Sequence, residues 1–159
     1  MPILSLLVAA AAAPLLDACG LLTSAEVAAV QGGAPRDARP TERRDGELIA
    51  QQCFYLAPDP AFSVSLEVRR PAPRVSARAL GERWKEMLKE DSEPGEDRPG
   101  PRRVTGLGRS ALWVGDAKLG ALYVLGRTAI VRVSVGGPAG EKAKIRACKS
   151  LARRVLRRL

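Results

Sequence analysis

The segment from Gly106 to Gly137 most constrains the fold, because it contains three consecutive strand-like runs separated by glycine-containing turns. The run at 111–114 is apolar, and the run at 119–125 is apolar at every position except one glycine. A run of the second kind is typical of a strand that is covered on both faces. From 128 to 135 valines alternate with polar residues, so the third strand should have one buried face and one wetted face. The segment therefore predicts a β-sheet at the centre of the fold.

Two further strands precede this segment. Residues 48–56 read as the first strand, and a proline-rich turn reverses the chain after it. From 62 to 69 apolar and polar residues alternate, which predicts one face toward the core and the other toward water. Glu67 lies on the polar face and Asp116 lies in a turn, so we expect both carboxylates to be solvated.

Three helices are predicted around these strands. Thr23 and Glu26 have the spacing of a capping box at the start of a short helix. Residues 76–90 carry an apolar stripe that includes Trp84, which we interpret as a core anchor rather than a platform for stacking a ligand. After Gly140, apolar residues recur every three or four positions to the end of the chain, which predicts a C-terminal helix.

The order of these elements is helix, two strands, helix, three strands, helix. This order predicts one α+β domain over 19–159, with a mainly antiparallel sheet of about five strands and the N-terminal, middle and C-terminal helices packed on it. Apolar residues make up 46% of the chain and charged residues 27%, as in ordinary globular proteins. The segments 34–47 and 91–103 are rich in proline, glycine and charge, so we predict flexible loops there.

The first 18 residues resemble a secretory signal peptide. An apolar run from 3 to 13 is broken by a single serine and ends in small residues that suit cleavage, although a positively charged start is absent. The run is too short to span a bilayer, which requires about 20 apolar residues. We therefore predict a signal peptide over 1–18 and an extracytoplasmic location, in the periplasm, the cell envelope or outside the cell. The alternative is a buried N-terminal helix, since alanine-rich sequence also favours helix.

Three cysteines cannot all pair within one chain, and the predicted export makes a disulfide expected. One arrangement joins Cys19 to Cys53 and leaves Cys148 as a small buried hydrophobic residue of the C-terminal helix. In the alternative, Cys19 is the lipid-bearing cysteine of a bacterial lipoprotein and Cys53 pairs with Cys148. The residues before Cys19 match a lipobox only in part, because Asp17 stands where that motif has a small uncharged residue.

The residue types that most catalytic sites need are absent or dispersed. The chain has no histidine, so the usual general base at neutral pH and the commonest metal ligand are missing. The cysteine spacings fit no zinc motif, and no nucleophile stands beside an evident base. Gly106-Leu107-Gly108 precedes a strand rather than a helix, so it is not a dinucleotide-binding motif. We therefore predict a protein that is not an enzyme and that uses no metal or other cofactor.

The C-terminal helix carries most of the positive charge of the chain. From Gly140 onward there are eight basic residues and one acidic residue, a net charge of +7 out of +9 for the whole chain. Such a row of cations binds phosphates or anionic lipid head groups, and it also occurs simply as the solvated face of a packed helix. Nucleic acid is the less suitable partner, because the chain is predicted to be exported. The candidate basic surface consists of Lys149, Arg153, Arg154, Arg157 and Arg158.

Several segments, in sequence order, resemble a group of small secreted or lipid-anchored bacterial domains of unknown function. The shared features are a Cys-x-Leu-Leu-Thr helix start at 19–23, a Cys-x-Tyr strand at 53–55 and a Gly-Leu-Gly segment followed by Ala-x-Trp at 106–113. The resemblance covers nearly the whole chain after Cys19, and its motifs are structural rather than catalytic. It implies a PsbP/Mog1-like α+β fold and a disulfide between Cys19 and Cys53. It implies no enzyme activity and no known ligand.

Two binding hypotheses for the function follow, and an enzyme whose catalytic residues the sequence does not reveal is the third alternative. The first is a non-catalytic extracytoplasmic domain that binds an envelope protein, a lipid or a small ligand, with the concave side of the sheet as the binding surface. The second is a module that binds an anionic membrane surface through the basic C-terminal helix. We expect a monomer in both cases. Salt separates the two, since binding through the helix should weaken steeply as ionic strength rises.

Overall fold

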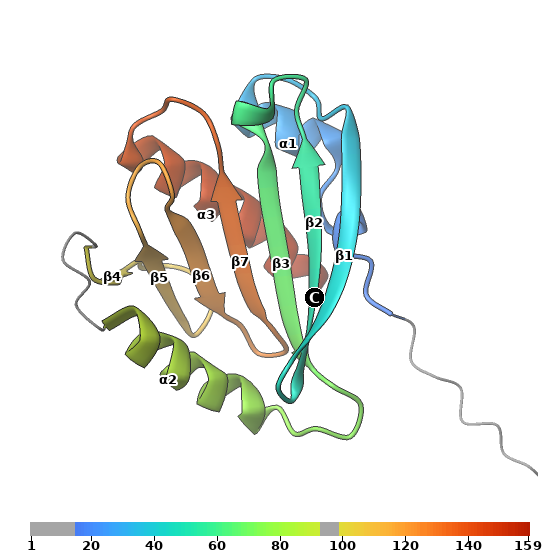
Figure 1. Cartoon of the computed structure of the whole chain (residues 1–159), viewed down its shortest axis with the longest axis vertical. Coiled ribbons are helices and arrows are strands. Elements are labelled where there is room, and N and C mark those ends of the chain that lie inside the picture. Colours follow the sequence, from blue (N-terminus) through green and yellow to red (C-terminus); the bar gives the residue numbers. More distant parts are fainter. Residues whose placement is uncertain (1–14, 93–98) are drawn as a thin grey trace, which may run out of the picture.

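The computed structural model describes residues 15–92 and 99–159 and shows a sheet with helices on both faces (Figure 1). The α+β class is as predicted, but the sheet has seven strands rather than about five. The elements, with η1 and η2 as short 3-10 helices, are η1 (Ala18–Leu21), α1 (Ser24–Gln31), β1 (Asp37–Asp45), β2 (Leu48–Leu56), η2 (Pro60–Phe62), β3 (Val64–Pro71), α2 (Arg78–Ser92), β4 (Arg102–Arg103), β5 (Ser110–Val114), β6 (Ala121–Leu125), β7 (Ile130–Val135) and α3 (Glu141–Arg158).

The sheet consists of two meanders that meet at its centre. Its strand order is β1-β2-β3-β7-β6-β5-β4, and all neighbouring strands are antiparallel. Strands β1 to β3 form one meander and strands β4 to β7 form the other. The two are joined by the pairing of β3 with β7, which places Leu66 opposite Val133.

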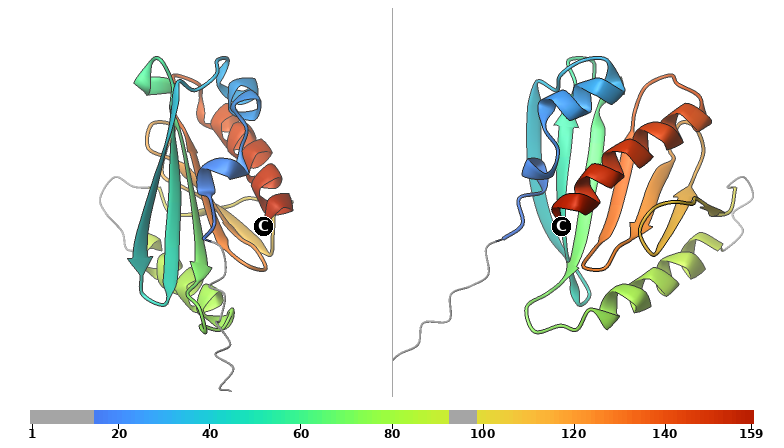
Figure 2. Two further views of the ribbon diagram at one scale, coloured as in Figure 1. Left: turned by 90° about the vertical axis from the view of Figure 1, so that its right-hand side faces the viewer. Right: turned by 180° about the vertical axis from the view of Figure 1, so that it is seen from behind.

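One face of the sheet is covered by η1, α1 and α3, as Figure 2 shows. The alternation predicted for β3 is observed, because Val64, Leu66 and Val68 are fully buried on this face. Helix α3 packs over β6 and β7 and inserts Cys148 and Leu151 into the same cluster. This cluster is the main core of the protein.

Helix α2 covers one end of the opposite face (Figure 1). Leu80 and Trp84 of α2 pack with Leu48, Leu125 and Ile130 in a second, smaller cluster. Trp84 is 6% exposed, which confirms its interpretation as a core anchor. The other end of this face extends beyond α2, and none of the described helices covers it.

The N-terminal helix α1 begins as predicted. The hydroxyl of Thr23 accepts a hydrogen bond from the N–H of Glu26 at 3.1 Å, and the Glu26 carboxylate accepts one from the Thr23 N–H at 2.9 Å. Both bonds of the capping box are therefore formed. Gly32 ends the helix in the left-handed conformation, with φ of 77°.

The segment 34–47, predicted as a flexible loop, is instead occupied mainly by strand β1. This strand pairs with β2 along its whole length, from Asp37 to Asp45. All its residues except Asp45 are exposed, so no hydrophobic alternation marks the strand in the sequence. Hydrogen bonds to β2 and a tight turn at Gly46, with φ of 59°, hold it in place.

The second predicted loop, 91–103, is also partly occupied by regular structure. Helix α2 continues to Ser92, and it begins at Arg78 because the Ser76 hydroxyl accepts a hydrogen bond from the Arg78 N–H at 3.2 Å. The two residues of β4 pair with β5 at the edge of the sheet. The rest of the prediction falls in part on 93–98, which lie outside the described residues.

The predicted signal peptide falls largely on residues 1–14, which also lie outside the described residues. The last residues of its predicted range take part in the fold. Leu16 packs against the main core, and Ala18 is 4% exposed within it. Across 15–92 and 99–159, no helix is long and apolar enough to cross a membrane.

Candidate functional site

Cys19 and Cys53 form a disulfide that ties η1 to β2, with 5.0 Å between their Cα atoms. Tyr55, two residues further along β2, supports the same junction by donating from its hydroxyl to the carbonyl oxygens of Ala18 and Cys19. The alternative pairing of Cys53 with Cys148 is therefore not formed, and the Cys19 sulfur is not free to carry a lipid. A disulfide is consistent with an oxidising, extracytoplasmic compartment.

Cys148, the remaining cysteine, is a thiol in the main core. Its side chain is fully buried, and burial raises its pKa to about 12. A thiol in this state is neither a nucleophile nor a metal ligand at neutral pH. Its interpretation as a small hydrophobic residue is confirmed. In the part of the chain that the structure describes, no group of three or more cysteine or acidic residues could hold a metal ion.

Glu67, predicted to be solvated, is instead buried within a network of ion pairs. Its carboxylate binds Arg69 at 2.7 Å and Arg43 at 3.2 Å. Arg69 also lies 3.5 Å from Asp45, which binds Arg83 of α2 at 3.2 Å. The alternation along β3 identifies its polar face correctly, but β1 and α2 cover that face with charged side chains. The network links β1, β3 and α2, and arginine neutralises each of its carboxylates, so it offers no free acid or base.

Two arginines of the predicted basic surface, Arg154 and Arg158, bind Glu26 of α1. Arg158 reaches both carboxylate oxygens, at 2.6 and 2.7 Å, and Arg154 lies 3.2 Å from one of them. Arg158 also donates to the carbonyl oxygen of Leu21 at 2.7 Å. The hydrogen bond from Arg158 is the main reason that the pKa of Glu26 falls to about 2. These two arginines therefore hold α3 against α1.

Two other charged residues of α3 also serve the fold. Lys144 is 4% exposed and donates from Nζ to the carbonyl oxygen of Ala117. Glu141, in the first turn of the helix, binds Arg102 of β4. Lys144 therefore belongs with Arg154 and Arg158 as a basic residue that is engaged within the molecule.

The other five basic residues of α3 form a row that we call the basic stripe. They recur at intervals of four, three, four and four residues, so they share one face of the helix. Within the described ranges, the ion pairs made by α3 involve none of them. The residues of the basic stripe are Lys142, Arg146, Lys149, Arg153 and Arg157. The sequence prediction includes three of them, and Lys142 and Arg146 extend the row by the same helical spacing.

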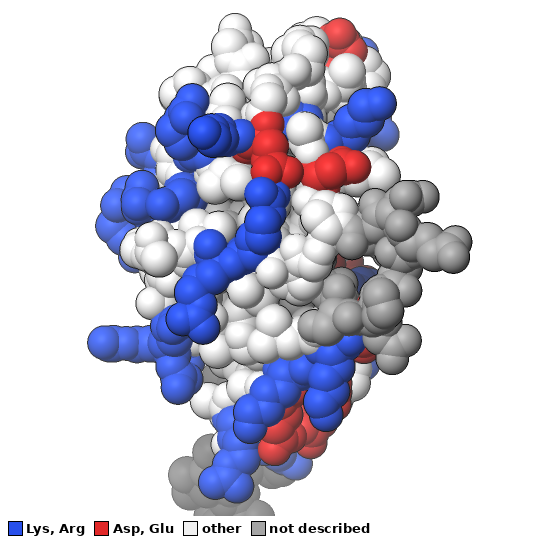
Figure 3. Space-filling model, turned by 90° about the vertical axis from the view of Figure 1, so that its left-hand side faces the viewer, with Lys and Arg blue, Asp and Glu red and all other residues white. Residues whose placement is uncertain are grey.

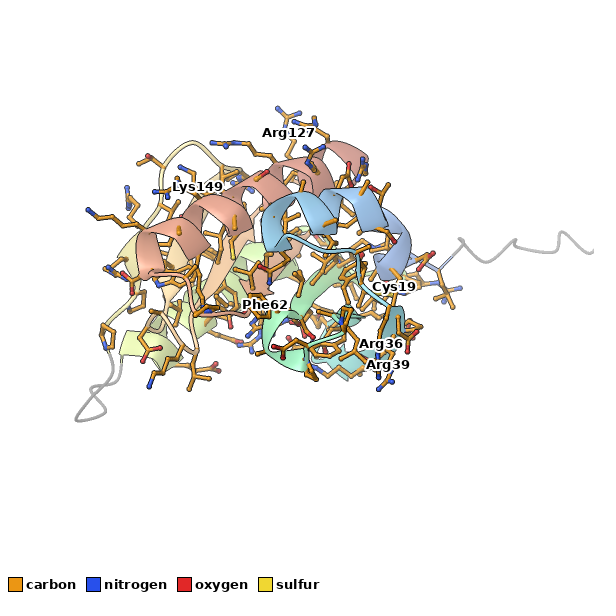
Figure 4. All side chains as sticks on the ribbon, turned by 90° about the horizontal axis from the view of Figure 1, so that it is seen from above. Cys19, Arg36, Arg39, Phe62, Arg127 and Lys149 are labelled. Carbon is orange, nitrogen blue, oxygen red and sulfur yellow. A yellow bond between two sulfur atoms is a disulfide. The ribbon has the colours of Figure 1, made fainter. Side chains whose placement is uncertain are left out.

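Arg127 extends the cationic surface beyond α3 (Figure 4), and Arg153 of the basic stripe reaches the loop between β4 and β5. Figure 4 shows Lys149 and Arg127, from the turn between β6 and β7, on the same side of the molecule and away from Arg36. The guanidinium of Arg153 lies close to Gly106 in the loop between β4 and β5, since a Cβ atom added to this glycine would be 3.9 Å from Nη2 of Arg153. Figure 3 shows Lys and Arg atoms spread over the adjacent side of the molecule, where Asp and Glu atoms gather in a few small groups.

The uncovered end of the second sheet face is a different candidate for a binding surface. Phe54 of β2 is 38% exposed there. Arg132 of β7 donates from Nε to the hydroxyl of Tyr123 at 3.2 Å, and its guanidinium lies 5.7 Å from the centre of that ring. This surface therefore offers aromatic and polar groups together with arginines, Arg132 and Arg39, the second of which is paired opposite Phe54 in the sheet, whereas the basic stripe offers mainly charge.

Comparisons with protein family models, with curated proteins and with solved structures find no match to this chain. The resemblance to small secreted domains with a PsbP/Mog1-like fold therefore stays a prediction. A function has to be inferred from the residues and contacts of the chain itself.

Proposed function

We propose that the protein is a non-catalytic extracytoplasmic domain that binds an anionic surface of the cell envelope through the basic stripe. The observation that carries this proposal is the division of the charges on α3. Arg154 and Arg158 are paired with Glu26, whereas the residues of the stripe have no carboxylate partner among the described residues. The stripe is therefore the part of the helix whose charge the fold does not use.

The positive charges of the basic stripe destabilise α3 when no anion is bound to them. This cost supports a role for the stripe in binding rather than in folding. Its successive residues stand three or four positions apart, and like charges at these spacings destabilise a helix by roughly 0.2–0.5 kcal/mol for each pair. Lys142 also lies in the first turn, where the helix dipole disfavours a cation. An anionic surface would offset both effects.

An anionic membrane surface suits a row of this kind. Each Lys or Arg held near such a surface contributes about 1 kcal/mol, so the five residues of the stripe would contribute on the order of 5 kcal/mol. The attraction is screened over about 8 Å at physiological ionic strength. Binding through the stripe should therefore be strong at low salt and weak at high salt.

The remaining features of the molecule support the non-catalytic and extracytoplasmic parts of the proposal. The chain has no histidine, Cys148 is a buried neutral thiol, and the carboxylate of Glu67 is neutralised by arginine. The Cys19–Cys53 disulfide suits an oxidising compartment.

Cosedimentation with vesicles tests the proposal. The oxidised protein should bind vesicles of phosphatidylglycerol and phosphatidylcholine far better than vesicles of phosphatidylcholine alone. Binding should weaken at least tenfold between about 50 and 300 mM salt. A triple variant with Arg146→Gln, Lys149→Gln and Arg157→Gln, which leaves Arg153 unchanged, should bind the phosphatidylglycerol vesicles at least tenfold more weakly.

The matched control removes the same charge elsewhere, by Arg36→Gln with Lys85→Gln and Lys89→Gln. All three residues are exposed and lie outside the stripe, and Figure 4 shows Arg36 far from Lys149. The control should bind within threefold of the unaltered protein. Equal loss in both triple variants would mean that only net charge matters, and the stripe would not be the binding surface.

A second candidate function is the binding of a ligand on the open end of the sheet. The exposure of Phe54 and the Arg132–Tyr123 contact favour it. A ligand held there by ring contacts should respond little to salt, and Phe54→Ala should weaken it while the triple substitution in the stripe should not.

A further inference from the structure

The loop between β4 and β5, residues 104–109, borders a hollow of about 410 Å³. The loop lies on the same face of the sheet as α3 (Figure 2), and Leu107 anchors it in the main core. Arg103 and Arg109 line the hollow, and Arg153 of the basic stripe approaches the same loop. None of the described residues that line the hollow is acidic. We call this hollow the loop pocket.

Four consecutive backbone N–H groups of this loop have no acceptor among the residues that the structure describes. The N–H of Val104 donates to the carbonyl oxygen of Ala111 at 2.9 Å, and that of Arg109 donates to the carbonyl oxygen of Leu125 at 2.8 Å. Between them, the N–H groups of 105–108 donate to no residue in the described ranges. Backbone donors rarely stay unpaired, so this run is open to water or to a bound anion.

We propose that the loop pocket binds the phosphate group of a small phosphorylated molecule. The inference rests on the proposed function, since Arg153 belongs to the basic stripe and also lies beside Gly106 of this loop, and it adds the chemical class of the anion. A phosphomonoester carries nearly two negative charges and three acceptor oxygens at neutral pH. Three arginines and a run of amide donors match that group. A carboxylate has one charge and two oxygens, and it would leave more of these donors unpaired.

The size of the loop pocket indicates more than a single ion. A volume of about 410 Å³ lies within the range of small-molecule sites, about 300–1,000 Å³. A sugar or glycerol group attached to the phosphate therefore has room. The same phosphate chemistry is offered by a free metabolite and by the head group of a lipid.

NMR titration of the oxidised, isotope-labelled full-length protein tests the inference. Inorganic phosphate and glycerol 3-phosphate are added at constant ionic strength, with chloride as the reference anion. The amide signals of Thr105, Gly106, Leu107 and Gly108 should shift and saturate with phosphate and with glycerol 3-phosphate but not with chloride. The variant with Arg103→Gln and Arg109→Gln should bind at least tenfold more weakly.

The control variant, with Arg36→Gln and Lys85→Gln, removes the same charge outside the pocket and should change the affinity less than twofold. Chloride shifts equal to those of phosphate, or unchanged affinity in the Arg103→Gln and Arg109→Gln variant, would overturn the inference. The amide spectrum of each variant also shows whether it is folded.

Vesicles that contain phosphatidic acid, compared with phosphatidylglycerol vesicles of equal charge, separate the two sources of phosphate. A preference for phosphatidic acid that needs Arg103 and Arg109 identifies a lipid head group, and glycerol 3-phosphate binding without this preference identifies a free molecule. If the loop signals do not respond while the stripe still binds phosphatidylglycerol vesicles, only the pocket is wrong. If substitutions in the stripe leave vesicle binding intact, the proposed function is wrong.

Discussion

Arg158, at the C-terminal end of α3, binds both carboxylate oxygens of Glu26 in the first turn of α1, at 2.6 and 2.7 Å. The two residues are 132 positions apart in the sequence. The Glu26 side chain is 13% exposed, so water screens the pair only in part. A bidentate pair of this kind fixes direction as well as distance, and it holds the first and last helices of the domain together.

Glu26→Gln should lower the free energy of unfolding by about 2 kcal/mol, because hydrogen bonds to charged groups contribute about 1.5–3 kcal/mol. Glutamine also fits the capping position, so the loss reports mainly on the ion pair. Urea unfolding measures the change. Glu82→Gln, on the exposed side of α2, is the control and should change the stability by less than about 0.5 kcal/mol. Equal stability of the two variants would contradict a structural role for the pair.

Stability should fall in acid in a range set by the same carboxylate. The pKa of Glu26 is about 2 in the folded protein against 4.5 ordinarily. The ionised Glu26 carboxylate therefore contributes its full stabilisation of the folded protein above about pH 4.5, and this stabilisation is lost as the pH falls toward 2. The difference in stability between the unaltered protein and the Glu26→Gln variant should be constant near pH 7 and should shrink through that range. A difference that grew in acid would refute the assignment.

Reduction of the Cys19–Cys53 disulfide should destabilise the protein by about 4 kcal/mol, since it closes a loop with a sequence separation of 34. Thermal unfolding with and without a reducing agent measures this effect. A variant with Cys19→Ser and Cys53→Ser should already have the lower stability and should not respond to the reducing agent. A further response in that variant would mean that another disulfide is present.

Cys148 should not react with thiol reagents in the native protein. The thiol is buried and its pKa is raised to about 12, so almost no thiolate reaches solvent at neutral pH. Labelling with a thiol-specific reagent, followed by mass spectrometry, should modify Cys148 only after unfolding in urea. Rapid modification without urea would show that the core opens around α3.

Gly120→Ala should destabilise the protein by about 2 kcal/mol or more. A Cβ atom at this position would lie 2.1 Å from Cζ2 of Trp113 and 2.3 Å from the carbonyl oxygen of Asp116, so buried groups would have to move. Gly33→Ala is the matched control, because nothing lies within 4 Å of a Cβ atom there. The comparison of the two in urea unfolding isolates the steric effect, and equal stabilities would contradict it.

The alternation of apolar and polar residues and the capping-box spacing are sufficient to predict the strands and helices that bury one face. Val64, Leu66 and Val68 alternate with polar residues, and the Thr23 and Glu26 spacing marks the start of α1. Strand β1 has no such pattern, because it is exposed on both sides and is held by backbone hydrogen bonds to β2. The burial of Glu67 could not be predicted for the same reason, since it depends on β1 and on the position of α2.

The candidate site shows a similar limit. Helical spacing alone places Lys149, Arg153 and Arg157 on one face. It also sets Arg154 and Arg158 apart from this row, but it cannot show that these two are the paired residues, because the pairing depends on where Glu26 lies in the folded chain. The unpaired N–H groups of the loop pocket could not be predicted from the sequence either, because they depend on the path of the backbone and no sequence motif marks them.

The pairing of β3 with β7 has a consequence for the order in which the protein folds. Each meander joins strands that follow one another along the chain, so each can form from local contacts. The pairing of Leu66 with Val133 closes a long loop that contains α2 and strands β4 to β6. Closing this loop costs chain entropy before the contacts between β3 and β7 have formed and can stabilise the closed state. The two meanders should therefore form first and dock along β3 and β7 in the slow step. Substitutions that shorten buried side chains of β3 and β7 where the two strands meet should slow folding. Substitutions that shorten side chains of β1 should mainly speed unfolding.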